Sequence, residues 1–231
     1  MKQLKRTLQR CMPSRHHAVV VASMGRSGST LVYDAIADGM AMVRFGHSSG
    51  AARRIVRDIA WDLDMCALTP GVVYKTHAFA EELPTHRSCR VVFVFGPASD
   101  AAISVLSCDR HHGPDWTAEH FRHLRACGSL DELERRDVLR FEEQIDGWLG
   151  RSGGTVLALR YDGLWSHADT LSEFVGFPVS FPARQPRNSP GDVEAATVER
   201  IRSCYSRLDA KIAALPSCVR APFQPSGPNG T

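Results

Sequence analysis

The chain alternates short, continuous apolar runs with longer stretches in which apolar residues recur at helical spacing. Short apolar runs are typical of strands buried on both faces, and the longer pattern is typical of amphipathic helices. The runs lie at residues 18–22, 72–75, 90–95 and 155–160. Apolar strands that alternate with helices predict a three-layer α/β fold, a parallel sheet with helices on both faces.

Helices are predicted between these strands and after the last of them. In residues 51–66 the apolar residues Ile55, Ile59 and Leu63 lie four apart, which is the spacing of one helix face. By the same criterion, further helices are expected at residues 100–108, 117–127, 131–149 and 168–175 and from about residue 192 onwards.

The length of 231 residues suits a single domain, which we expect at residues 17–215. Residues 1–16 carry several lysines and arginines but no acid. They predict a flexible, solvated arm, and a membrane-surface or transit helix is the alternative. Residues 216–231 are rich in proline and glycine and predict a disordered tail.

Composition narrows the class of protein. A net charge of +3 is too small to predict a nucleic-acid partner. No apolar run approaches the roughly 20 residues of a membrane-spanning helix, so no span is expected. The seven cysteines show no paired spacing, which predicts free thiols and a cytoplasmic location. These features leave the oligomeric state open.

A glycine- and serine-rich turn at Ser23–Ser29 follows the first apolar run and precedes a helical pattern. A strand, a tight turn and a helix N-terminus together form an anion site, because unpaired N–H groups and the positive end of the helix dipole meet there. Gly28 lets the backbone approach a ligand, and Ser27, Ser29 and Thr30 add hydroxyl donors. The stretch therefore predicts a phosphate-binding loop.

The loop lacks the charges of a triphosphate site. The pattern G-x-x-x-x-G-K-[ST] needs a glycine where Ser23 stands and a lysine where Ser29 stands. The strand at 91–95 is followed by Gly96, not by an aspartate that could anchor magnesium. A ligand with a 5′-phosphate and no β- or γ-phosphate fits better, and a P-loop kinase is the alternative.

Four segments in the same order resemble one family, the sulfotransferases that use 3′-phosphoadenosine 5′-phosphosulfate (PAPS). MGRSGSTLV in the loop resembles their 5′-phosphosulfate loop, and VVYKTH at 72–77 is similar to the strand with their catalytic histidine. VVFVFGPASDAAIS at 91–104 resembles their 3′-phosphate-binding strand and helix. VLALRYDGL at 156–164 resembles a further strand of the family. The resemblance spans about residues 18–192 and implies a fold like that of the P-loop nucleotide hydrolases.

The resemblance implies transfer of a sulfonate group from PAPS, without a metal, to a hydroxyl of a small-molecule, sugar or lipid acceptor. His77 would be the general base, Lys75 would assist it, and Arg26 would contact the sulfonate. Ser104 would bind the 3′-phosphate. The residues themselves agree with the first role, since a neutral imidazole accepts a proton readily and His77 leaves the strand on the same side as Lys75.

The chain departs from the family at Gly96, where an arginine would help to hold the 3′-phosphate. Arg187 or Arg184 is the candidate replacement. Without either of them the 3′-phosphate would be held weakly, because a neutral hydroxyl binds phosphate less well than a cation. A nucleotide-binding protein that has lost catalysis is therefore a second alternative, although a mere binder has no need of Lys75 and His77.

Six residues between 108 and 127 are potential metal ligands: Cys108, His111, His112, His120, His123 and Cys127. Their spacing follows no standard zinc pattern, so no metal is predicted. We expect a histidine-rich helix surface that borders the acceptor pocket. Tyr161 and Asp162 are expected either to support the site or to pack in the core.

Overall fold

The computed structural model describes residues 5, 7, 9, 14–83, 89–151, 155–185 and 193–222. Within these residues one six-stranded sheet has the order β2-β3-β1-β4-β5-β6. Its strands are β1 (Ala18–Ser23), β2 (Arg57–Ile59), β3 (Val73–Thr76), β4 (Cys89–Phe95), β5 (Val156–Arg160) and β6 (Cys218–Arg220). Neighbouring strands are parallel from β2 to β5, and β6 runs antiparallel to β5.

Seven α-helices lie among the described residues and connect or follow these strands. They are α2 (Ser29–Phe45), α3 (Gly50–Val56), α4 (Ala98–His112), α5 (Pro114–Leu124), α6 (Phe141–Gly150), α7 (Ala168–Val175) and α8 (Ala195–Ala214). Short 3-10 turns are η1 (Ala80–Glu82), η2 (Leu130–Glu132), η3 (Tyr161–Gly163) and η4 (Trp165–His167).

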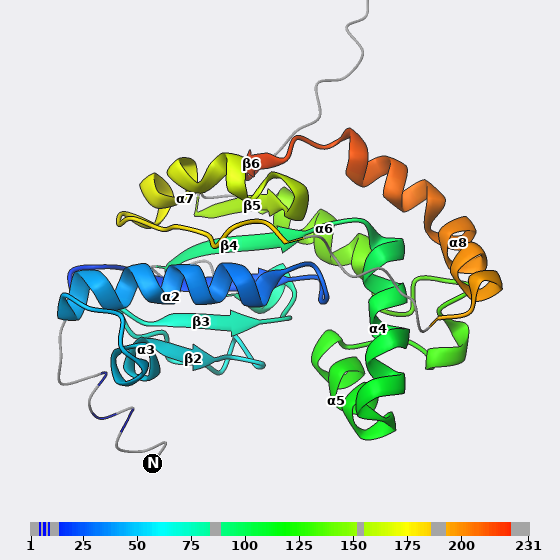
Figure 1. The fold of residues 1–231 in the computed structure, drawn as a ribbon, viewed down its shortest axis with the longest axis horizontal. Helices are drawn as coiled ribbons and strands as arrows, with labels where there is room; N and C mark the ends of the chain where they lie inside the picture. The colour runs from blue at the N-terminus through cyan, green and yellow to red at the C-terminus, as the bar shows by residue number, and fades with distance from the viewer. Residues whose placement is uncertain are drawn as a thin grey trace, which may run out of the picture.

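The core has two halves because side chains of β1 alternate between the faces of the sheet. Val19 and Val21 pack in one cluster with the buried residues of α2, α3 and α7. Val20 and Ala22 pack in the other cluster with those of α4, α6 and α8. In Figure 1 α2 crosses in front of the sheet, and α4 and α8 stand on the side to which the parallel strands point. The predicted three-layer α/β fold is confirmed, with the antiparallel β6 as an addition.

The carboxyl ends of the parallel strands share one edge of the sheet. In Figure 1 the arrowheads of β2, β3 and β4 point towards the side where α4 and α5 stand. Ala22 of β1 lies opposite Thr76 of β3, so the segments after β1 and β3 leave the sheet side by side. Ligand sites in open parallel sheets form at this edge.

The helix predicted at residues 51–66 is wrong beyond Val56. Arg57 has extended backbone angles, and Arg57–Ile59 pair with β3 as the edge strand β2. Ile59, expected on a buried helix face, is 53% exposed. Sheet pairing outweighs the local helical spacing here, which is common for segments this short.

The helix predicted at residues 131–149 begins ten residues late, at Phe141. Arg140, immediately before it, has a φ of 58°, which no helix interior adopts. The apolar residues Val138 and Leu139 are buried in the preceding loop, so they contribute to the core without being helical.

The predicted tail is wrong at residues 218–220, because these form β6. Residues 223–231 lie outside the described residues. Of the N-terminal arm, residues 5, 7, 9 and 14–16 are described, and Lys5 and Gln9 contact the domain. Lys5 forms an ion pair with Asp58 (3.2 Å), and the buried Gln9 donates to the Ile55 carbonyl (2.7 Å).

None of the helices in the described part of the chain is both long and apolar enough to cross a bilayer.

Candidate functional site

The loop after β1 leads directly into α2 and leaves the start of that helix available to an anion. Gly28 is the N-cap residue, with φ 89° and ψ 11°, and no side chain caps the helix. The first turn contains no acidic residue. The backbone N–H groups of the first turn have no partner within the helix, and the dipole is positive there. The loop therefore has the physical properties of a phosphate site.

Gly28 is required by a neighbouring side chain as well as by its backbone angles. A Cβ atom on Gly28 would lie 2.3 Å from Cδ2 of Tyr161. The sequence assigned Gly28 to a close approach between backbone and ligand, whereas the structure places the Tyr161 ring against it. Tyr161 thus packs on the loop and lines the cavity described next.

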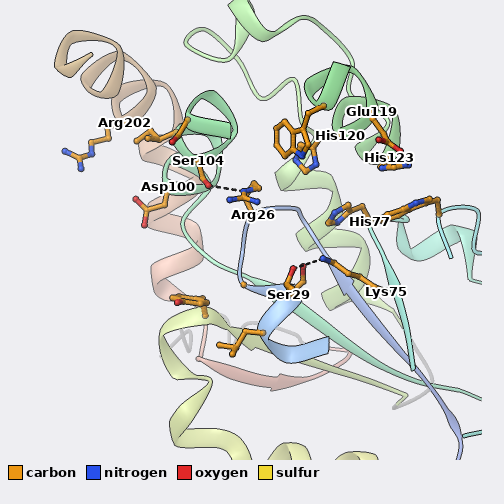
Figure 2. Close-up of a pocket in the computed structure, with 18 residues that line it drawn as sticks. Arg26, Ser29, Lys75, His77, Asp100, Ser104, Glu119, His120, His123 and Arg202 are labelled. Atoms are coloured by element: carbon orange, nitrogen blue, oxygen red, sulfur yellow. Dashed lines mark hydrogen bonds and ion pairs between the residues drawn. The ribbon is translucent and has the colours of Figure 1, made fainter. Parts of the chain in front are cut away.

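A cavity of about 750 Å³ opens above the loop at the carboxyl edge of the sheet. Its floor is formed by Gly28, Ser29, Thr30 and Leu31 at the start of α2. One wall comes from α4 and α8, and the other from α5, Trp61 and the end of β3. Figure 2 shows Arg26, Ser104, His77 and His120 around this space, whereas the guanidinium of Arg202 lies at its outer edge and points away from Arg26. The volume is within the usual range for small-molecule sites.

The three hydroxyls predicted to bind phosphate have different surroundings. Thr30 and Ser29 line the cavity, and Thr30 Oγ1 accepts a hydrogen bond from Lys75 Nζ (2.7 Å; Figure 2). The hydroxyl of Ser27 is buried and donates to the Val94 carbonyl (2.8 Å). The prediction that this hydroxyl binds the ligand is therefore wrong, since it ties the loop to β4 instead.

His77 lies beside Ser23, the last residue of β1, and this contact determines which ring nitrogen carries hydrogen. His77 Nδ1 is 3.0 Å from the Ser23 carbonyl oxygen and 3.0 Å from Ser23 Oγ. A carbonyl oxygen only accepts, so the hydrogen-bond geometry assigns the hydrogen to Nδ1. Nε2 of the neutral ring is then unprotonated, and His77 lines the cavity. The side chain is able to accept a proton there.

The surroundings keep His77 neutral. Burial, the neighbouring His120 and the Lys75 ammonium together lower the pKa of His77 to about 3, although the contact with Ser23 acts in the opposite direction. Burial also lowers the pKa of Lys75. An anionic ligand on the loop would raise the pKa of His77, because a negative charge nearby favours the imidazolium form.

Helix α6 holds the segment that carries His77. Gln144 Nε2 donates to the His77 carbonyl (3.2 Å), and Trp148 Nε1 donates to the Ala78 carbonyl (3.2 Å). Both side chains are buried. Because two fixed donors hold consecutive carbonyls, the backbone that presents the imidazole has little freedom.

Arg26 and Ser104 contact each other, although the sequence placed them at different ends of the nucleotide. Arg26 Nε donates to Ser104 Oγ (3.0 Å), as the dashed line in Figure 2 marks. Arg26 has a φ of 49° and its guanidinium lies 6.0 Å from the centre of the Trp116 ring. Both residues line the cavity, so Arg26 supplies positive charge between the loop and α4.

The sequence missed Arg202, a cation in the cavity wall that comes from α8. Asp209 of the same helix accepts from the Ala98 N–H (2.6 Å) at the start of α4, and this contact holds α8 beside the site. No motif marks Arg202, because it reaches the cavity only through helix packing. Arg184 lies over the Trp165 ring at 5.4 Å and is not in the cavity wall. Arg187 lies outside the described residues.

Only some residues of the histidine-rich segment line the cavity in the structure. His120 and His123 line the cavity together with Trp61 and Trp116, whereas neither Cys108 nor Cys127 does. Trp61 stacks on His123 with ring centres 4.0 Å apart. In the described ranges no three His, Cys, Asp or Glu residues are grouped so that they could hold a metal ion. This wall is aromatic and histidine-rich.

Comparisons with known proteins give a likeness only to solved structures, and it is distant. No protein-family model and no curated protein matches the chain. Among solved structures, the chain is similar to the mouse sulfotransferase SULT7A1 complexed with PAP (adenosine 3′,5′-bisphosphate), with 14% sequence identity and a TM-score of 0.44. The match covers 91% of this chain and 70% of that chain. A likeness at this level carries no argument about function, which we base on the chain's own residues.

We predict that Gly28→Ala lowers the melting temperature more than Gly46→Ala. Both glycines have positive φ, for which a Cβ costs about 1–2 kcal/mol, but a Cβ on Gly46 would have no neighbour within 4 Å. The extra loss at Gly28 comes from the Tyr161 ring, and Gly28→Ala combined with Tyr161→Ala should remove it. Thermal denaturation of the variants measures both effects. Equal losses at the two glycines would show that Tyr161 does not constrain the loop.

Proposed function

We propose that this chain transfers the sulfonate group of PAPS to a hydroxyl of a small acceptor, with His77 as the general base. The observation that carries the proposal is the contact between His77 Nδ1 and the Ser23 carbonyl. It leaves an unprotonated imidazole nitrogen in a cavity whose floor is an uncapped helix N-terminus. A base next to an anion site suits transfer of an anionic group to a hydroxyl.

The proposed reaction is an in-line displacement at sulfur. The acceptor oxygen forms a bond to sulfur as the bond between sulfur and the bridging oxygen of the 5′-phosphate breaks. The electron pair of that bond remains on the phosphate, which leaves as adenosine 3′,5′-bisphosphate (PAP). His77 Nε2 takes the proton of the acceptor hydroxyl, so that no free alkoxide forms.

The neighbouring residues support the charged groups of this reaction. The N–H groups at the start of α2 would bind the 5′-phosphate, and the Ser29 hydroxyl lies beside them. Arg26 and Lys75 line the same cavity and would stabilise the negative charge that develops on the bridging oxygen. Arginine is permanently charged, so Arg26 would stabilise this charge without donating a proton.

We predict that PAP stabilises the protein in the presence of EDTA and that ATP with magnesium does so less. The loop offers Ser29 where a triphosphate site needs lysine, and Gly96 follows β4 where a metal anchor would stand. Thermal-shift assays with PAP, ADP and ATP test the expectation. A larger shift from magnesium ATP would favour a P-loop kinase.

We predict that His77→Ala reduces sulfonate transfer by a factor of roughly 10²–10⁴ and changes PAP affinity by only a few-fold. A general base acts mainly in the transition state and contributes little to binding of the nucleotide. Single-turnover release of PAP from PAPS measures the first quantity, and isothermal titration with PAP measures the second. Near wild-type turnover in His77→Ala would mean that another group removes the proton.

The position of the 3′-phosphate needs a separate test, because residue 96 is a glycine and not an arginine. Ser104 provides a neutral hydroxyl, and Arg202 is a described cation in the same wall. We predict that Arg202→Ala weakens PAP binding about tenfold and leaves AMP binding unchanged, as loss of one charge-assisted contact implies. Arg184→Ala is the matched control, since Arg184 lies outside the cavity wall.

Arg187 is the remaining candidate for this role, and Arg187→Ala belongs in the same titrations. If it abolishes the preference for PAP over AMP while Arg202→Ala does not, the 3′-phosphate site lies at Arg187. Gly96→Arg gives an independent check. A Cβ on Gly96 would lie 3.6 Å from Cβ of Tyr161, an ordinary contact, so the position has room for a Cβ atom. The added arginine should tighten PAP binding more than AMP binding.

A further inference from the structure

His120 faces His77 across the cavity and is nearly as deeply buried. The two imidazoles are almost perpendicular, at 86°, with ring centres 5.6 Å apart. Trp116 stacks on the other side of the His120 ring, with centres 4.8 Å apart. His120 is 8% exposed and His77 is 6% exposed. Figure 2 shows His120 above His77, with Arg26 to one side.

His120 differs from the other histidines of this wall because its Nε2 has no hydrogen-bond partner among the residues that the structure describes. His77 Nδ1 contacts Ser23, and His123 Nε2 lies 2.8 Å from Arg122 Nη2. Buried polar atoms in folded proteins almost always have a partner, since an unpaired one is costly. An unpaired nitrogen in the wall of a binding cavity indicates that a group of the ligand forms the missing hydrogen bond.

One edge of the His120 ring lies against the phosphate loop. A Cβ on Gly25 would be 3.4 Å from His120 Cε1, the carbon between the two ring nitrogens. This edge therefore faces the start of the phosphate loop. Burial and the Arg26 guanidinium lower the pKa of His120 to about 4, so the ring is neutral near pH 7. A neutral imidazole has one N–H donor.

We propose that His120 and His77 hold the acceptor hydroxyl between them, so that the site transfers sulfonate to oxygen in preference to nitrogen. This inference rests on the proposed sulfonate transfer. The hydroxyl donates its hydrogen to His77 Nε2 and accepts a hydrogen bond from the Nε2–H of His120. These two bonds fix the orientation of the oxygen and direct its second lone pair at the sulfur.

The preference follows from the number of lone pairs. A hydroxyl oxygen has two, so it accepts from His120 with one and forms the new O–S bond with the other. The proton passes to His77, His120 keeps its own, and the electron pair of the broken S–O bond leaves on the phosphate of PAP. A neutral amine has one lone pair, which the new N–S bond uses. The amine therefore has no lone pair left to accept the hydrogen bond from His120.

The test compares 2-naphthol with 2-naphthylamine as acceptors. The two probes have the same flat ring system, which suits a wall that contains Trp61 and Trp116, and they differ in the reacting atom. Transfer from PAPS is measured as kcat/KM for each probe in the wild type, His120→Ala and His120→Asn. His47→Ala is the control, since His47 is exposed and lies outside the cavity wall.

The wild type should favour 2-naphthol. His120→Ala should lower kcat/KM for 2-naphthol by roughly 10-fold to 100-fold, as loss of one buried hydrogen bond implies, and change that for 2-naphthylamine by no more than about threefold. His120→Asn should recover part of the loss, because its amide N–H donates from a similar position. PAP affinity should stay constant in all variants, which also verifies that they fold.

Three results would overturn the inference. An equal loss for both probes would indicate a structural role for His120, and no loss for either would show that His120 does not contact the acceptor. In both cases His77→Ala would still abolish transfer, so the proposed function would stand. A wild-type protein that binds PAP but transfers to neither probe would count against the proposed function, and the inference would fall with it.

Discussion

The site depends on one contact between neighbouring strands, that of His77 with the carbonyl of Ser23. It forms because Ala22 and Thr76 lie opposite each other in the two strands. The residues that follow them, Ser23 and His77, therefore meet at the carboxyl edge of the sheet. A shift of one residue in this register would turn the imidazole to the other face. The pairing of β1 with β3 therefore determines both where the His77 imidazole lies and which of its nitrogens is left without hydrogen.

The sequence predicted most of what the parallel sheet dictates. Strands buried on both faces are continuous apolar runs, so β1, β4 and β5 were recognisable, and the residues that follow strands fall at one edge by topology. Local periodicity failed at β2, a three-residue edge strand whose pairing with β3 is a tertiary effect. It failed again at residues 131–140, where burial comes from a loop and not from a helix face.

The same distinction between strand positions and tertiary packing applies to the candidate site. The place of Lys75 and His77 at the carboxyl edge could be predicted from the strand that carries them, and both line the cavity. Arg202 could not, because it enters the cavity only when α8 packs on α4. The Ser27 hydroxyl was misassigned because sequence does not show whether a polar group faces a ligand or, as here, a backbone carbonyl of the neighbouring strand. Contacts between distant helices and the direction of small side chains are the parts that need coordinates.

The antiparallel strand β6 changes which strand forms the edge of the sheet. Its residues Cys218–Arg220 pair with Leu157–Leu159 and cover the outer edge of β5, a strand made largely of apolar residues. An uncovered strand edge offers unpaired N–H and carbonyl groups to any other extended chain. Proteolytic trimming back to residue 217 would expose that edge and create a surface on which molecules could pair strand to strand. The segment that looks dispensable by composition thus replaces an apolar edge strand with one of three residues that carries the exposed Arg220.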